Sequence, residues 1–303
     1  MKKTIVFLLI CAILITACKP LSLAGHSGIK TIVVTYSILG SVVKDLVGTS
    51  ANVVVLIPNG QDPHEWEPSA KDIETVNKAD LIVQNGLGLE GGLQKTLSLA
   101  AQQGVKTFIA SDHITIRKVG QGEGIPGGGT DQALGASDPH LWTDPLTMKQ
   151  VATAMAQQLK VDLGLDVSQQ ATDTESRLDS LNQDILTLVG SLPTANRKLV
   201  TGHESLGYFA DAYGFKLVGA IIPSLTSQAE VSAADLATLK TLIGENQVKA
   251  IFTELGTPPA IAEAIGKETG VKVIQLSTHM LPAYGSYFTF MRDLAQAIVD
   301  NLK

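Results

Sequence analysis

Cysteine is almost absent from this 303-residue chain. Its two cysteines, Cys11 and Cys18, both lie in the first 18 residues, where a pair of lysines precedes an apolar run over residues 4–15. This order is typical of a lipoprotein signal peptide, so we expect cleavage of residues 1–17 and attachment of lipid to the thiol of Cys18. No free thiol would then remain, which excludes disulfides and thiolate metal sites. A membrane-spanning helix is the alternative, but the run is shorter than the roughly 20 residues needed to cross a bilayer.

Aromatic and basic residues are also scarce. Aromatic residues make up 5% of the chain, and 23 Lys and Arg face 29 Asp and Glu, for a formal net charge of −6. This acidity argues against nucleic acid and anionic lipid surfaces as partners. A surface adhesin or another binding module would be supported by large aromatic or basic patches, and the sequence offers neither clearly.

From residue 31 onward, short apolar runs alternate with helix-length segments, a pattern typical of parallel sheets covered by helices. Strands are expected at Thr31–Tyr36, Asn52–Ile57, Asp80–Gln84, Lys106–Ala110, Lys198–Thr201, Lys216–Ile221, Lys249–Thr253 and Val271–Leu276. Helices are expected at Ile38–Val47, Ser69–Lys78, Glu90–Gln103, Pro145–Val161, Ser168–Leu192, Leu206–Tyr213, Ala233–Asn246, Pro259–Thr269 and Ser286–Leu302.

The predicted fold class is therefore α/β, with two lobes whose parallel-type sheets are flanked by helices. We assign residues 18–30 to a tether, 31–163 to the first lobe, 164–196 to a linker region built on one long helix, and 197–303 to the second lobe. A glycine-rich segment, residues 119–137, lacks the Gly-Lys-Ser/Thr ending of a phosphate-binding loop and the strand directly before it. We interpret it as a mobile surface loop.

Four of the six histidines follow the ends of predicted strands, where open α/β sheets bind their ligands. They are His64, His140, His203 and His279. His26 falls in the tether and His113 lies outside any shared motif, so neither is included in the site.

Two of these histidines share the motif Asp-Pro-His-x-Trp, at residues 62–66 and 138–142. In each copy the proline stiffens the backbone before the histidine. Four imidazole nitrogens can complete a tetrahedron around Zn²⁺, so the pattern predicts a metal site. A lone histidine would more often be a buried, hydrogen-bonded ring, but four at equivalent positions favour ligands. The two tryptophans, Trp66 and Trp142, are expected to pack beside the site without binding the ion.

These residues resemble a known family. The segment Asp-Pro-His64-Glu-Trp-Glu-Pro-Ser, the Asp-Pro-His140 motif, Thr-Gly-His203-Glu-Ser-Leu-Gly-Tyr-Phe and the late Ser-Thr-His279 are similar to the zinc and manganese solute-binding proteins of ABC importers. The resemblance implies two α/β lobes joined by one rigid helix that permits only small closing movements, with a single metal site between the lobes. It also implies a monomer anchored outside the bacterial cytoplasmic membrane that serves a permease and its ATPase.

By this resemblance, His64, His140 and His203 take the first three ligand positions. Receptors likened to manganese or iron usually have Glu at the third, so His203 favours Zn²⁺, with Mn²⁺ and Fe²⁺ as alternatives. His279 stands where the family usually has Asp. Direct binding by His279, substitution by a carboxylate such as Glu204 or Glu254, and a water ligand all remain open, and we expect direct binding.

Four neutral nitrogens leave the charge of the ion uncompensated, so nearby carboxylates are expected to accept hydrogen bonds from the imidazole N–H groups. The candidates are Glu67, Asp144, Glu204 and Glu254, with helix capping or surface solvation as the alternative for each.

A metallohydrolase is a further alternative, because Glu204 beside His203 could activate a metal-bound water. Catalytic zinc usually keeps an open position beside three protein ligands, whereas four histidines would close the site. The sequence also contains neither His-Glu-x-x-His nor Gly-x-Ser-x-Gly. We therefore expect a binding protein and no enzyme.

Overall fold

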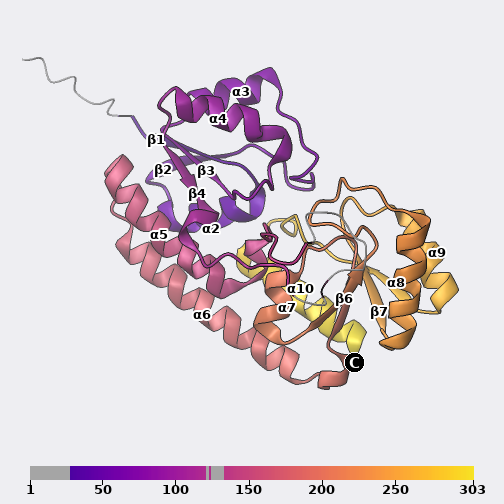
Figure 1. Cartoon of the computed structure of the whole chain (residues 1–303). Helices are drawn as coiled ribbons and strands as arrows, with labels where there is room; N and C mark the ends of the chain where they lie inside the picture. The colour runs from indigo at the N-terminus through magenta and orange to yellow at the C-terminus, as the bar shows by residue number, and fades with distance from the viewer. Residues whose placement is uncertain (1–27, 121–122, 124–132) are drawn as a thin grey trace, which may run out of the picture.

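The structure is a computed structural model that describes residues 28–120, 123 and 133–303 (Figure 1). The predicted signal peptide, Cys18, most of the tether and most of the glycine-rich segment lie outside the described residues. Within the described ranges, no helix is both long enough and apolar enough to cross a membrane.

Two parallel four-stranded sheets form the frame of the molecule, as the sequence predicts. The first has the order β2-β1-β3-β4 and the second the order β6-β5-β7-β8. The strands are β1 (Lys30–Val34), β2 (Ala51–Val55), β3 (Leu81–Gln84), β4 (Thr107–Ile109), β5 (Lys198–Thr201), β6 (Lys216–Ala220), β7 (Ala250–Thr253) and β8 (Lys272–Gln275). The chain thus changes direction across each sheet beside its first strand, and ligands of open α/β sheets bind at the carboxyl ends of strands at such a point.

Helices cover both faces of each sheet, so the central strands β1, β3, β5 and β7 are mostly buried. In the first lobe α3 and α4 lie over one face and α2 and α5 over the other, and in the second lobe α8 and α9 lie opposite α7 and α10 (Figure 1). The helices are α2 (Ser37–Val47), α3 (Ala70–Asn77), α4 (Gln94–Gln102), α5 (Pro145–Leu163), α6 (Ser168–Gly190), α7 (Gly207–Tyr213), α8 (Ala233–Glu245), α9 (Pro259–Thr269) and α10 (Tyr287–Leu302).

Helix α6 runs beside α5 along the first lobe and continues beneath the second (Figure 1). Its buried face includes Leu178, Leu181, Ile185 and Val189, and it packs against α2, α5 and α10. One apolar core therefore extends through both lobes, while a smaller core lies among β5, β7, α8 and α9.

Two local predictions were wrong. The helix expected from Glu90 begins only at Gln94, after a 3₁₀ turn over Gly91–Leu93, because the buried Glu90 side chain instead accepts hydrogen bonds from Asn85 N and Thr35 Oγ1. His140 does not follow a strand of either sheet. It follows a loop whose antiparallel bridge joins Lys118 to Ser137.

Candidate metal centre

Four histidines converge between the two sheets. One ring nitrogen from each of His64, His140, His203 and His279 lies within 4.8 Å of all the others. The four residues are between 0% and 4% exposed. They come from segments that follow β2, precede α5, follow β5 and follow β8, so residues distant in sequence build one enclosed cluster.

Two of the separations between these nitrogens match those around a tetrahedral ion. His140 Nε2 lies 3.3 Å from His64 Nε2 and 3.1 Å from His203 Nε2. Nitrogens bound to Zn²⁺ at about 2.0–2.1 Å stand roughly 3.3 Å apart in a tetrahedron. The buried His279 Nε2 has no hydrogen-bond partner among the described residues, and a buried polar atom left in this way is costly unless something binds it. The donor set therefore fits a metal ion.

The two Asp-Pro-His motifs form the same turn. Asp62 Oδ1 accepts a hydrogen bond from His64 N, and Asp138 Oδ1 accepts one from His140 N, each at 2.9 Å. Asp138 Oδ1 also lies 2.9 Å from His140 Nδ1. A carboxylate at this place favours the proton on Nδ1 and leaves the lone pair of Nε2 directed at the cluster.

Glu254, in the loop after β7, contacts the other pair of histidines. Its Oε1 lies 2.9 Å from His203 Nδ1 and accepts a hydrogen bond from His203 N. Its Oε2 accepts hydrogen bonds from Ser205 Oγ and Thr278 Oγ1, and Thr278 Oγ1 lies 2.7 Å from His279 Nδ1. Glu254 is therefore placed to orient both rings.

Burial and charge set different pKa values within the cluster. Burial, with the proximity of the other rings, lowers the pKa of His64 and lowers that of His279 to about 3. Burial also lowers the pKa of His140, although Asp138 opposes this shift. Burial acts in the same direction on His203 and is the largest single effect, but the charge and side-chain contact of Glu254, together with the charges of Asp62 and Glu204, outweigh it, so the pKa of His203 is raised. At neutral pH, most of these rings are thus already in the neutral form that binds metals.

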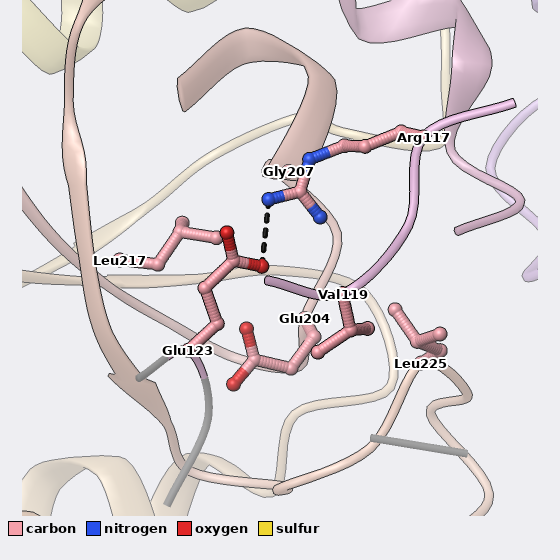
Figure 2. Close-up of a pocket in the computed structure, with 7 residues that line it drawn as sticks. All are labelled: Arg117, Val119, Glu123, Glu204, Gly207, Leu217 and Leu225. Atoms are coloured by element: carbon pink, nitrogen blue, oxygen red, sulfur yellow. Dashed lines mark hydrogen bonds and ion pairs between the residues drawn. The ribbon is translucent and has the colours of Figure 1, made fainter. Parts of the chain in front are cut away.

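The other predicted carboxylates do not contact the histidine rings. Asp144 is the N-cap of α5, where it accepts hydrogen bonds from Leu146 N and Thr147 N, and Glu67 is exposed. Glu204 is buried, and its Oε1 has no hydrogen-bond partner among the described residues. It lines a small cavity beside Arg117 and Glu123 (Figure 2), and burial raises its pKa to about 7.

Both tryptophans occupy packing positions. Trp142 is fully buried and donates from Nε1 to Thr278 O, while Trp66 is partly buried against the main core. Of the two histidines left out of the site, His113 stacks on Phe108 with 4.4 Å between the ring centroids, and His26 lies outside the described residues.

Several residues that contact the centre are not among those predicted from the sequence. The Asp of each Asp-Pro-His motif was a visible signal, since an Asp two residues before a histidine can accept its backbone N–H. Thr278 stands in the Ser-Thr-His279 motif, whereas no local pattern pointed to Arg117 or to Ser227, whose Oγ donates to Asp62 Oδ2 at 2.7 Å.

Two α/β lobes with one enclosed cluster of histidines between them define a two-lobed solute-binding protein. Residues 32–301 match the family described as "Zinc-uptake complex component A periplasmic", and the chain belongs to this family.

Named relatives and a solved structure agree with this assignment. The chain is 30% identical over 275 residues to the high-affinity zinc uptake system protein ZnuA of Bacillus subtilis, covering 88% of this chain and 85% of the relative. The chain is also 30% identical to the zinc-binding lipoprotein AdcA of Streptococcus pneumoniae. The match covers 87% of this chain but only 52% of AdcA. The manganese ABC transporter substrate-binding lipoprotein PsaA of Streptococcus anginosus is 26% identical over 100% of the chain and 99% of its own length. The periplasmic zinc-binding protein TroA from Treponema pallidum has a TM-score of 0.78 at 25% identity, over 91% of this chain and 99% of its own.

Proposed function

We propose that this protein captures a divalent transition-metal ion, in the first place Zn²⁺, outside the cytoplasm and delivers it to the permease and ATPase of an ABC importer. The observation that carries the proposal is the cluster of four buried histidines with nitrogens within 4.8 Å of one another. His64, His140, His203 and His279 would be the ligands. The names of the relatives, which include zinc and manganese receptors, support the transport role.

The choice of Zn²⁺ rests on the chemistry of the donors. Nitrogen ligands bind Mn²⁺ less tightly than Fe²⁺, and both less tightly than Zn²⁺. Cu²⁺ binds nitrogen tightly but prefers a square arrangement, which four nitrogens in a tetrahedron would not offer. Mn²⁺ or Fe²⁺ is the alternative cargo. A hydrolytic role is disfavoured because four protein ligands would leave no position for a reactive water.

Metal analysis tests the cargo directly. The protein without residues 1–18 is equilibrated with equal concentrations of zinc, manganese, iron and copper, and its metal content is measured beside that of His203→Ala, His279→Ala and His113→Ala. We expect one zinc per chain, lost in His203→Ala and weakened in His279→Ala. His113→Ala is the matched control, since His113 stacks on Phe108 away from the cluster, and it should bind zinc as the parent does. Absence of metal, or manganese retained in the first two variants, would overturn the site.

We further propose that Cys18 anchors the protein to the outer face of the membrane as a monomeric lipoprotein. Cys18→Ser should release a protein that still binds zinc into the soluble fraction. Unchanged membrane association of this variant would contradict the anchor.

A further inference from the structure

Arg117 is a buried arginine that contacts three carboxylates beside the metal centre. Its side chain is 6% exposed. Nε donates to Asp211 Oδ2 at 2.8 Å, Nη2 to Glu123 Oε2 at 2.7 Å and Nη1 to Asp138 Oδ2 at 3.4 Å. Figure 2 shows the guanidinium directed at Glu123 beside Gly207, the first residue of α7.

Asp138 has two oxygens with separate tasks. Oδ1 holds His140 through both its backbone N–H and its ring Nδ1, while Oδ2 faces the guanidinium of Arg117. The carboxyl group is fully buried. A buried carboxylate that loses one partner must rotate, admit water or take up a proton, and each of these changes would disturb the contact with His140.

The guanidinium is itself held from the second lobe. Asp211 lies on α7, and Tyr208 of the same helix accepts a hydrogen bond at its hydroxyl from Arg117 N at 2.9 Å. The backbone of Arg117 also accepts a hydrogen bond from Asp138 N. Arg117 and Asp138 thus form one unit, which α7 fixes in place.

We propose that Arg117 is a positioning residue for the metal centre, acting through Asp138 to hold the ring of His140 with Nε2 directed at the bound ion. This inference rests on the proposed metal-binding function. It predicts that metal affinity depends on a side chain that touches none of the four histidines.

Zinc titration of Arg117→Met tests the proposal, with Arg197→Met as the matched control. Arg197 is a partly buried arginine whose side chain bonds to backbone carbonyls of Leu192 and Tyr213. Loss of a group that orients a metal ligand typically weakens metal binding about 10–100-fold, and Arg117 supports such a group, Asp138. We expect at least a tenfold rise in the Kd for zinc in Arg117→Met, a smaller rise in Arg117→Lys, and a change below twofold in Arg197→Met.

A double-mutant cycle shows whether Arg117 acts through Asp138. Adding Arg117→Met to Asp138→Asn should weaken zinc binding no further than Asp138→Asn alone. The double variant leaves no buried carboxylate unpaired at position 138, so the test stands even if Arg117→Met alone does not fold. Additive losses, or equal losses in Arg117→Met and Arg197→Met, would overturn the inference.

Two spectroscopic readouts separate positioning from general destabilisation. Visible absorption of bound Co²⁺ should change in Arg117→Met and stay unchanged in Arg197→Met. In the metal-free protein, the Nδ1–H proton of His140, followed by NMR, should exchange with solvent faster in Arg117→Met. An unchanged exchange rate together with an unchanged Co²⁺ spectrum would contradict the proposal. If the parent protein bound no metal, the proposed function would fail, whereas parental binding with an unaffected Arg117→Met would refute only this inference.

Discussion

At the scale of single residues, one carboxylate connects two of the four histidines. Glu254 contacts the ring of His203 directly and that of His279 through the hydroxyl of Thr278. Burial would raise the pKa of Glu254, but His203, His279 and the surrounding hydrogen bonds hold it well below its usual value. Glu254 therefore remains ionised and places negative charge beside the histidine rings.

Glu254→Gln keeps the shape of this side chain and removes its charge. We expect zinc affinity to fall about 10–100-fold, because the ring of His203 loses the negative charge beside it. Competition with a coloured zinc chelator measures the change, and exposed Glu67→Gln is the control. Equal affinities of the two variants would show that Glu254 does not support the centre.

The pH dependence of zinc binding follows from His203. Its raised pKa means that His203 carries a proton as the pH falls, whereas His64, His140 and His279, with lowered pKa values, remain neutral. A metal ion must displace that proton, so the affinity for zinc is highest above the pKa of His203 and decreases below it. We expect a loss of about tenfold per pH unit, the slope for one proton. Titrations between pH 7.5 and pH 5.5 measure the slope, and a constant affinity would contradict an imidazole site.

At the scale of elements, the start of α7 determines how closely the second lobe approaches Asp138. An added Cβ at Gly207 would lie 2.1 Å from Asp138 Oδ2 and 2.6 Å from Arg117 Nη1. Glycine is therefore required here for close approach.

Gly207→Ala should destabilise the protein by about 1–3 kcal/mol, as overpacking does, and weaken zinc binding by displacing Asp138. Gly244→Ala in α8 is the control, since a Cβ there meets no atom within 4 Å, and it should stabilise by up to about 1 kcal/mol. Urea denaturation measures both variants. Equal stabilities of Gly207→Ala and the parent would refute the steric argument.

At the scale of the whole molecule, the two lobes share one apolar core. Helix α6 packs on α2 and α5 of the first lobe and on α10. The hydrogen bonds Trp142–Thr278 and Ser227–Asp62 also join the two lobes. A large rotation of the lobes would expose apolar surface, at a free-energy cost of about 25 cal/mol for each Å² exposed.

We therefore expect zinc to change the overall shape very little. The radius of gyration from small-angle X-ray scattering should agree with and without zinc within experimental error. Ser227→Ala, which removes the same inter-lobe bond to Asp62 and leaves α6 intact, should give the same result. A clear contraction on zinc binding would indicate a hinge that this core does not predict.

The sequence by itself determined the α/β class, the succession of strands and helices, and the four histidines that the structure brings together. These features depend on local patterns: apolar periodicity, turn-forming prolines and a repeated Asp-Pro-His-x-Trp motif. Their signals lie within a few neighbouring residues.

Only the tertiary structure decided which polar groups support the histidines. Asp138 and Arg117 are 21 residues apart, Glu254 and His203 are 51 apart, and Ser227 and Asp62 are 165 apart. The same distance along the chain explains the error at Glu90, whose helix-favouring side chain bonds Thr35 across 55 residues. Local propensity contributes tenths of a kcal/mol, whereas an unpaired buried carboxylate costs several, so partners distant in the chain determined these positions.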